Sequence, residues 1–312
     1  MFKNFDELYD AVRGQANRIV IPGANNMEVL EACRDGQKEG LISGGILIGP
    51  EKEIREQAEK AGLCLEGFEI IDKSRYEDTD KLCADMCNLA VDLVKAGKGD
   101  FLVKGLVDTK WYMRAILRKE AHAFPEGNLL SHFALFQTEN YHKMFVISDV
   151  AVCPAPTLEQ KAKIIENSVD ILRALGVETP KVAVVCAVEK PSPKIQSTLD
   201  AVELVKMNKE GKIKNCVVEG PYDTYISFSK TAAEEKGIRN AQVPGDLDLA
   251  LLPDLNAANV MYKSICLFGK GIRNASLLTG VNIPVILPSR ADSPETKLNS
   301  IALACYLKDK FK

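Results

Sequence analysis

The chain has 312 residues, of which 46% are hydrophobic and 27% charged, a composition that is typical of a folded protein and excludes a disordered one. Its length predicts two domains of ordinary size. A formal net charge of −3 excludes a surface that attracts nucleic acid or anionic lipid as a whole. We therefore expect a globular protein with no nucleic acid as a partner.

Nine cysteines are scattered along the chain, and only Cys83 and Cys87 lie close together. Their spacing predicts packing on one face of a helix, and no nearby histidine supports a metal site. Free cysteines indicate a reducing compartment. The first ten residues lack the apolar core of a signal peptide, and no apolar run reaches about 18 residues. We therefore expect a cytoplasmic protein that does not bind a membrane.

The first third of the chain alternates between short apolar runs and longer amphipathic stretches. The apolar runs predict strands over residues 18–23, 44–50, 68–72 and 100–105. The amphipathic stretches predict helices over residues 26–40, 51–62 and 79–97. Such alternation predicts an α/β fold with a mostly parallel sheet and helices on both faces.

The pattern changes near Ser148, where strand-like runs follow one another without a helix. A strongly amphipathic helix over 157–176 then opens a second series of strands. These are predicted over residues 181–189, 216–221, 247–253 and 265–271. The last strand, within 281–288, and the last helix would pack on the first domain. We therefore predict one discontinuous domain of residues 1–147 plus 280–312 and a second domain of residues 148–279.

The segment after the last predicted strand combines a hydroxyl, a guanidinium and a carboxylate. Ser289, Arg290 and Asp292 follow directly on that strand, and Ser293 is a candidate N-cap of the final helix. Ligands of open α/β sheets bind beyond the carboxyl ends of strands, and a helix N-terminus favours an anion. These residues are therefore candidates for holding a phosphate, or they merely shape the turn.

Three further segments place polar side chains at the end of a predicted strand. Asp254 and Asn256 open a helix, and Asn259 follows one turn later, so these side chains either cap the helix or contact a ligand. Arg114 lies near the start of another helix, where a cation does nothing for the helix dipole. Lys190 stands in a loop with two prolines. By charge alone, both cations also fit a solvated surface.

The four segments together resemble the phosphate acetyl/butyryltransferase family over nearly the whole chain. "PDLNAAN" (253–259) and "PVILPSRADS" (284–293) look like its two signatures. "EKPSPKIQSTLDA" (189–201) is similar to a segment of the butyryl branch, and "WYMRAIL" (111–117) to a helix that carries an arginine.

This resemblance implies two α/β domains with a cleft between them, as in isocitrate and isopropylmalate dehydrogenases. It also implies a homodimer that works without a metal, with coenzyme A as a substrate and no permanently bound cofactor. The implied reaction is acyl-CoA plus phosphate to acyl phosphate plus CoA, by direct transfer without an acyl-enzyme. An acyl kinase would be its metabolic partner.

Several roles follow from the resemblance. Ser289 would hydrogen-bond the developing charge, and Arg290 would hold the phosphate. Arg114 would contact the phosphate or coenzyme A, and Asn256 would line the same cleft. Lys190, Asp254 and Asn259 would also bind substrate.

Two departures from the family pattern bear on mechanism and substrate. The acetyl branch has a base aspartate where this chain has Thr296, so Asp292 is the favoured base and Glu295 the alternative. The butyryl branch usually has an aspartate where this chain has Tyr225, which would reshape the acyl pocket.

A C3 to C5 acyl group, with butyryl leading, is therefore expected, and acetyl is the runner-up. A metal- and NAD-dependent dehydrogenase and a non-catalytic acyl-CoA-binding protein are more distant alternatives.

Overall fold

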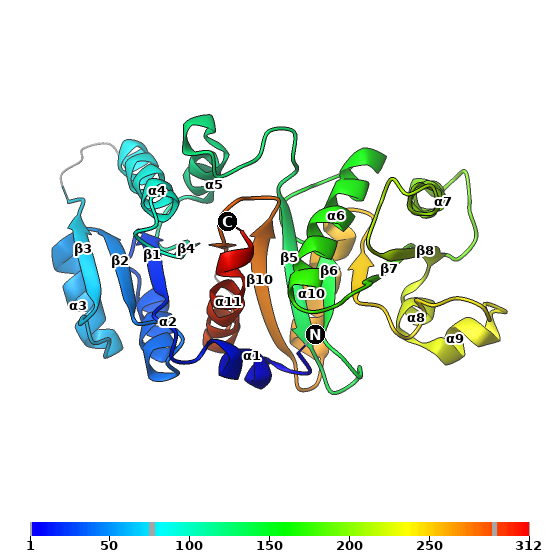
Figure 1. Cartoon of the computed structure of the whole chain (residues 1–312), viewed down its shortest axis with the longest axis horizontal. Coiled ribbons are helices and arrows are strands. Elements are labelled where there is room, and N and C mark those ends of the chain that lie inside the picture. The colour runs from blue at the N-terminus through cyan, green and yellow to red at the C-terminus, as the bar shows by residue number, and fades with distance from the viewer. Residues whose placement is uncertain (1, 75–78, 289–291, 312) are drawn as a thin grey trace. The chain divides into compact units, whose positions relative to one another are not determined.

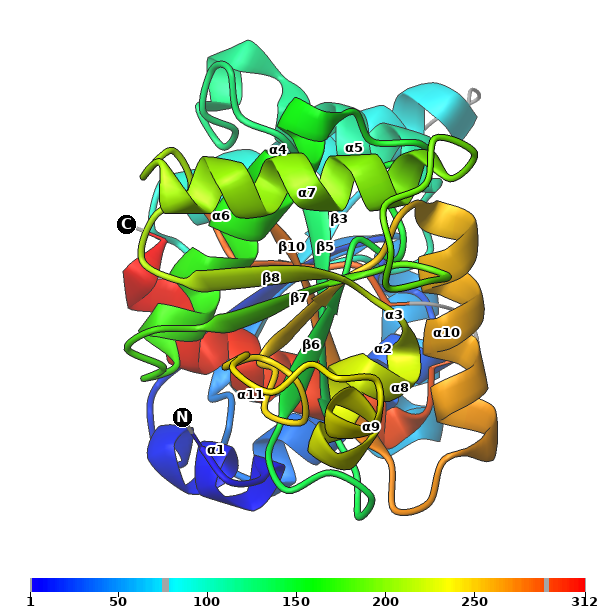
Figure 2. The ribbon, with the colours of Figure 1, turned by 90° about the vertical axis from the view of Figure 1, so that its right-hand side faces the viewer.

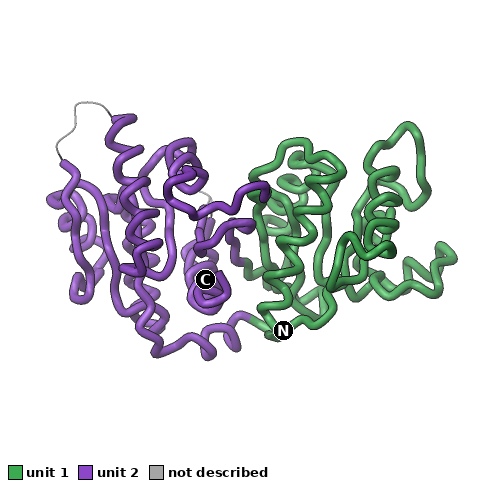
Figure 3. Tube along the Cα trace, turned by 45° about the horizontal axis from the view of Figure 1, so that its top comes forward, with its two compact units in different colours: residues 1–4, 129–274 green, residues 5–128, 275–312 purple. Residues whose placement is uncertain are grey.

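The computed structural model describes residues 2–74, 79–288 and 292–311. The chain forms two compact units, which Figure 3 colours separately. Unit 2 comprises residues 5–128 and 275–312, and unit 1 comprises residues 1–4 and 129–274. No helix in the described part of the chain is long and apolar enough to span a membrane.

Unit 2 is built on a mostly parallel sheet with the strand order β3-β2-β1-β4-β11-β10. The strands are β1 (Arg18–Pro22), β2 (Gly44–Gly49), β3 (Phe68–Asp72), β4 (Phe101–Val103), β10 (Arg273–Thr279) and β11 (Val285–Ile286). Only β10 and β11 pair antiparallel among them. The central strands are buried along their length because helices cover both faces, as their unbroken apolar runs predict.

Helices of unit 2 form two layers (Figure 1). One layer contains α1 (Phe5–Val12), α2 (Met27–Lys38), α3 (Glu51–Ala61) and α11 (Pro294–Leu307), and the other contains α4 (Thr79–Lys95) and α5 (Thr109–Leu117). Two short 3-10 helices, Lys119–Ala121 and Lys308–Lys310, complete the unit. Cys83 and Cys87 are buried on α4, which confirms their predicted packing role.

Unit 1 has the strand order β5-β6-β9-β7-β8. Its strands are β5 (Ser131–Gln137), β6 (Phe145–Ser148), β7 (Lys181–Val185), β8 (Val217–Tyr222) and β9 (Leu249–Leu251), and only β5 runs antiparallel to its neighbour β6. The helices are α6 (Leu158–Ala174), α7 (Gln196–Lys209), α8 (Thr224–Phe228), α9 (Lys230–Glu235) and α10 (Leu255–Phe268). In Figure 2, α7 lies on one side of β7 and β8, and α8 and α9 lie on the other.

The predicted strand over residues 265–271 is wrong. Residues 265–268 instead form the end of α10, where Leu267 and Phe268 are exposed. Four apolar residues in a row do not distinguish a strand from a helix end. The true strand is β10, which we missed because its sequence RNASLLT contains buried polar residues. Two of them are hydrogen-bonded: the Asn274 amide donates to the Tyr262 hydroxyl, and the Ser276 amide donates to Ser300 Oγ.

The structure confirms the α/β class and the mostly parallel sheet. Residues 129–147, which we assigned to the first domain, belong to unit 1 here, and residues 275–279 belong to unit 2. The division into domains at residues 148 and 279 stays a prediction, because compactness does not test which parts fold independently.

A buried ion pair joins α6 to α7 in unit 1. Lys161 Nζ lies 2.6 Å from Asp200 Oδ2, both residues are buried, and Gln196 donates a further hydrogen bond of 2.8 Å to Asp200. Replacing Lys161 with Met should lower the free energy of unfolding by about 3–5 kcal/mol, because Asp200 would remain buried without its cation. Urea denaturation would measure this.

The matched control for that variant is Lys161→Met combined with Asp200→Leu. It should recover most of the loss, because an apolar pair removes the buried charge altogether. A loss below about 1 kcal/mol in the single variant would contradict the structural role of this pair.

A second charged cluster lies before β9, at the amino-terminal end of the unit 1 strands. Asp246 accepts hydrogen bonds from His142, Lys143 and Lys181, and Asp248 accepts one from Lys143 at 2.7 Å. Burial raises the pKa of Asp246, but these hydrogen bonds outweigh it and hold the pKa well below its usual range.

This shift gives stability a defined pH dependence. A carboxyl with a depressed pKa stabilises the fold above its unfolded-state pKa, near 3.8, and that stabilisation is lost as the pH falls further. Asp246→Asn should therefore lower stability at pH 7 by about 1 kcal/mol, a small value because the Asp246 side chain is 41% exposed and screened. The difference in stability between the two proteins should be constant from pH 7 to about pH 5 and should shrink as the pH falls below about 3.8, and a difference that stays constant at lower pH would contradict this prediction.

Candidate functional site

The carboxyl edge of the unit 2 sheet contains a point where the strand order reverses direction. From β1 the chain proceeds outward to β2 and β3, and β4 then lies on the other side of β1. In open α/β sheets, ligands bind outside the strand ends at such a switch point. We therefore expect a ligand site beside the loops that follow β1 and β4.

These two loops touch each other through glycine. The Leu106 amide donates a hydrogen bond of 2.7 Å to the Gly23 carbonyl. A Cβ atom on Gly105 would lie 2.2 Å from that carbonyl oxygen, and Gly23 itself has a φ of +69°. Any larger residue at either position would force the loops apart, so glycine fixes this edge of the sheet.

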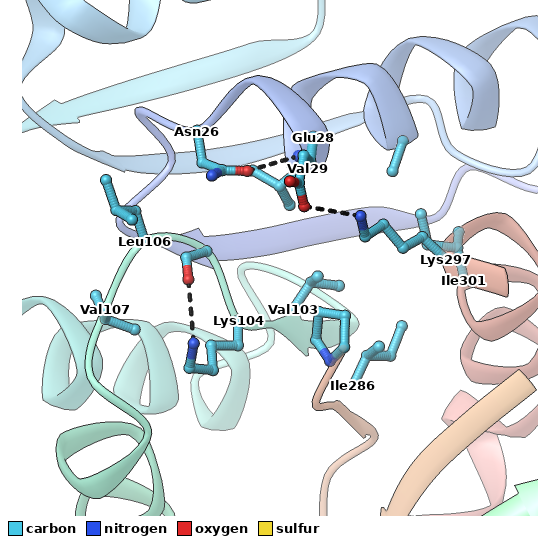
Figure 4. A pocket seen from close by; sticks show the side chains of 13 residues that line it. Asn26, Glu28, Val29, Val103, Lys104, Leu106, Val107, Ile286, Lys297 and Ile301 are labelled. Carbon is cyan, nitrogen blue, oxygen red and sulfur yellow. Dashed lines mark hydrogen bonds and ion pairs between the residues drawn. The ribbon is translucent and has the colours of Figure 1, made fainter. Parts of the chain in front are cut away.

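A cavity of about 130 Å³ lies beside these loops (Figure 4). Its lining comes from the first turns of α2, the end of β4 and the loop after it, the end of β11, and α11. The apolar lining residues are Val29, Ala32, Val103, Leu106, Val107, Ile286, Pro288 and Ile301, and the remaining ones are Asn26, Glu28, Lys104, Gly105 and Lys297. All of them belong to unit 2.

The N-terminus of α2 and one ion pair position the polar side chains of the cavity. Asn26 caps α2 by accepting a hydrogen bond of 3.1 Å from the Val29 amide. Glu28, in the first turn, lies 2.9 Å from Lys297 Nζ, and the Lys297 side chain is only 12% exposed. Lys104 Nζ lies 3.5 Å from the Gly105 carbonyl oxygen. The cavity therefore combines an apolar floor with two ammonium groups and one carboxylate.

The predicted catalytic segment follows this cavity in the chain. Ser289 and Arg290 lie outside the described residues, and their roles stay predictions. Pro288, one position earlier, lines the cavity, and Asp292 is half-buried just before α11. Ser293 caps α11 as predicted, with its hydroxyl accepting a hydrogen bond of 3.1 Å from the Thr296 amide.

Arg114 lies in the last turn of α5, on the exposed side of the helix, so the prediction that it lies near the helix start is wrong. A cation in the last turn is favourable for the helix dipole. Its guanidinium carbon is 4.9 Å from the centre of the Trp111 ring, and the Trp111 indole donates a hydrogen bond of 3.0 Å to Asp80. The helix starts after its N-cap, Asp108, whose side chain accepts a hydrogen bond from the Lys110 amide. Arg114 is thus oriented on an aromatic face, and its predicted role in binding substrate is untested.

The candidates on α10 differ in their surroundings. Asp254 caps the helix, accepting a hydrogen bond of 3.0 Å from the Ala257 amide, and the Asn259 amide donates one of 3.1 Å to the Val150 carbonyl. Asn256 is exposed. Capping is therefore established for Asp254, while contact of any of these three with a ligand stays a prediction.

Lys190 is exposed in the loop between β7 and α7. Its neighbour Glu189 lies 3.2 Å from Lys236, which also lies 2.7 Å from Asp223 at the end of β8. This bridge holds the carboxyl ends of β7 and β8 together. Tyr225, just beyond, is exposed.

Sequence reasoning missed Asp149 and most of the cavity. Asp149 is buried directly after β6, and its carboxylate accepts hydrogen bonds from the amides of Ala151, Val152 and Cys153. An aspartate between an apolar run and a proline-rich turn was the available signal. No comparable signal pointed to Lys297, because its neighbours come from segments far away in the sequence.

The described part of the chain offers little support for a buried cysteine nucleophile or for a metal-dependent dehydrogenase. Burial raises the pKa of Cys33, Cys87, Cys153 and Cys216 to about 12, so these thiols are protonated near neutral pH. Among the residues that the structure describes, no three metal-ligating side chains cluster together. The aspartates that a dehydrogenase would need are also separated, since Asp246 and Asp248 precede β9 and Asp254 follows it.

Comparison with known proteins identifies the family. The chain matches the model described as "Phosphate acetyl/butaryl transferase" over residues 4–90 and 77–305. It is 41% identical over 308 residues to a phosphate butyryltransferase from Clostridium acetobutylicum, which covers 98% of this chain and 99% of the relative. It is 36% identical over 299 residues to a phosphate acetyltransferase from Thermotoga maritima, covering 96% and 98%.

A solved structure agrees with these matches. The branched-chain phosphotransacylase from Enterococcus faecalis superimposes with a TM-score of 0.81 at 26% identity, covering 94% of this chain and 99% of that one. The full-length match in sequence and the match in fold lead to one conclusion: this chain belongs to the phosphate acetyl/butyryl transferase family.

Proposed function

We propose that this chain transfers a short acyl group between coenzyme A and inorganic phosphate, so that acyl-CoA and phosphate give acyl phosphate and CoA. The observation that carries this is the 41% identity to a phosphate butyryltransferase over nearly the full length of both proteins. Butyryl or another C3 to C5 acyl group is the leading substrate. The branched-chain phosphotransacylase supports this size, and the phosphate acetyltransferase relative keeps acetyl as the alternative.

Direct transfer is the mechanism that fits the side chains. A phosphate oxygen forms a bond to the acyl carbon while the carbon–sulfur bond breaks, and the thiolate of CoA leaves. In reverse, the CoA thiol gives a proton to a base and its thiolate attacks the acyl phosphate. The buried cysteines Cys33, Cys87 and Cys153 are protonated and are poor acyl acceptors, and transfer without an acyl-enzyme is what the family resemblance implies.

The roles of individual residues belong to the same proposal. Ser289 donates a hydrogen bond to the oxyanion, Arg290 holds the phosphate, and Asp292 accepts the thiol proton. Arg114 contacts the phosphate or coenzyme A. Lys190, Asp254, Asn256 and Asn259 bind the substrate. The dipole of α11 supports this assignment, because the positive end of a helix favours an anion, and α11 begins four residues after Arg290 in the chain.

Wider features of the family complete the proposal. We infer the two-domain fold of isocitrate and isopropylmalate dehydrogenases, divided as predicted from the sequence. Coenzyme A is a substrate rather than a resident cofactor. The enzyme is cytoplasmic, and an acyl kinase consumes or supplies its acyl phosphate.

A homodimer is supported by the exposed surface of α10. Only Ala258 of this helix is buried, whereas Val260, Leu267 and Phe268 are 66%, 74% and 81% exposed. Large exposed apolar side chains on one helix are typical of a surface that binds another protein. A second copy of this chain is the partner that we propose.

The activity and its base can be tested together. The protein, mixed with phosphate and acetyl-, propionyl-, butyryl-, isobutyryl- or isovaleryl-CoA, should release free thiol, with the highest kcat/KM on a C3 to C5 substrate. Asp292→Asn should lower kcat by about 10²- to 10⁴-fold, the usual contribution of a general base. Glu295→Gln, three residues later in the chain, is the matched control and should leave kcat nearly unchanged.

The alternatives give different results in this assay. Preference for acetyl-CoA would identify a phosphate acetyltransferase. A large loss in Glu295→Gln rather than Asp292→Asn would reassign the base. Binding of acyl-CoA without release of thiol by the unmodified protein would indicate a non-catalytic acyl-CoA-binding protein.

The dimer is tested by the double variant Leu267→Glu, Phe268→Glu. Charges at the centre of an apolar interface should convert the dimer to a monomer in sedimentation velocity experiments. Leu117→Glu, at an exposed leucine of α5, is the control and should remain dimeric. A monomeric unmodified protein would contradict the proposed dimer.

A further inference from the structure

The cavity beside β4 has a lining that suits an aliphatic group better than an ion. Six of its wall residues are buried and aliphatic: Val29, Ala32, Val103, Val107, Ile286 and Ile301. Polar groups occur at Asn26, Glu28, Lys104 and Lys297 (Figure 4). Small-molecule pockets usually have this composition, in which an apolar wall holds the body of the ligand and a few polar groups orient it.

We propose that this cavity holds the aliphatic chain of the acyl group and limits its length. This rests on the proposed acyl transfer and adds the subsite that selects the acyl chain. The carbonyl end would lie towards the ammonium groups of Lys104 and Lys297, and the hydrocarbon tail would contact the aliphatic floor.

The size of the cavity agrees with a short chain. Its volume of about 130 Å³ is roughly ten times the 10–15 Å³ that a single water molecule needs in the same measure. A short acyl group fits in that space. Coenzyme A itself is many times larger, so the cavity accommodates the end of the substrate and not its body. A free phosphate would leave the aliphatic floor without a matching surface.

The walls of the cavity belong to packed strands and helices, which allows them to set a sharp limit on the length of the acyl chain. Ile286 belongs to β11 and Val103 to β4, two strands paired in register, and Ile301 lies on α11. The Glu28–Lys297 ion pair links α2 to α11 beside the same space. A wall of packed strands and helices does not yield to an extra methylene group as a surface loop would.

Ala32 is the wall residue best placed to test this. It lies on α2, is buried, and has the smallest side chain that lines the cavity apart from Gly105. Valine at this position would add two methyl groups to the occupied space. Pockets of this kind discriminate about 10- to 200-fold for one methylene group.

The experiment compares kcat/KM on acetyl-CoA and on butyryl-CoA. Ala32→Val should lower kcat/KM on butyryl-CoA about 10-fold or more and leave that on acetyl-CoA within about 2-fold. Ala84→Val, a half-buried alanine of α4 outside the cavity, is the matched control and should leave the ratio unchanged. Ile301→Val enlarges the space instead and should raise the relative kcat/KM on isovaleryl-CoA, a readout that stands even if Ala32→Val folds poorly.

Three outcomes would overturn the inference. Equal losses on acetyl-CoA and butyryl-CoA in Ala32→Val, together with an unchanged preference in Ile301→Val, would show that the acyl chain binds elsewhere. A rise in the KM for phosphate alone would make the cavity a phosphate subsite. If the unmodified protein transferred no acyl group at all, the proposed function would fail, and this inference with it.

Discussion

The parallel pairing of β4 between β1 and β11 is the constraint on which the candidate site depends. Parallel strands end at the same edge of a sheet, so this pairing gathers three chain segments that are about 80 and 180 residues apart in the sequence. The loops after β1 and β4 approach closely only because Gly23 and Gly105 have no side chains. The end of β11 then brings Pro288 to the same cavity. A different strand order would disperse these groups.

The fold was largely predictable because its elements obey local rules. Gly62 ends α3 in a left-handed conformation, Asp108 and Ser293 cap their helices, and the buried strands are unbroken apolar runs. The strand β10 escaped prediction for a tertiary reason. The Asn274 side chain donates to the Tyr262 hydroxyl and the Ser276 backbone amide to Ser300 Oγ, and no local pattern reveals those partners. The prediction at the end of α10 was wrong for the opposite reason, because its exposed apolar residues have the same sequence pattern as a buried strand.

Some features of the candidate site could likewise be predicted from the sequence, and others could not. Caps could be predicted, because a cap and its acceptor amide lie within one turn, and Asp254 and Ser293 are examples. The cavity could not be predicted, because Ala32, Lys104 and Lys297 become neighbours only when the strand order is known. The family resemblance identified the reaction from motifs that are short in sequence. It favoured a C3 to C5 acyl chain but did not locate the pocket for that chain, whose proposed walls come from four separate segments.

The environment of Thr296 connects the choice of base with the choice of substrate. In the acetyl branch an aspartate would occupy this position, but here the residue is buried and its hydroxyl lies 3.0 Å from Ser293 Oγ. A neutral hydroxyl makes this contact without the desolvation penalty that a buried carboxylate would incur. The base that we propose is Asp292, which lies on the amino-terminal side of the same cap. Lys297, the next residue after Thr296, reaches the cavity that we assign to the acyl chain. One turn of α11 therefore combines the absence of the acetyl-branch aspartate with a residue that lines the proposed acyl pocket.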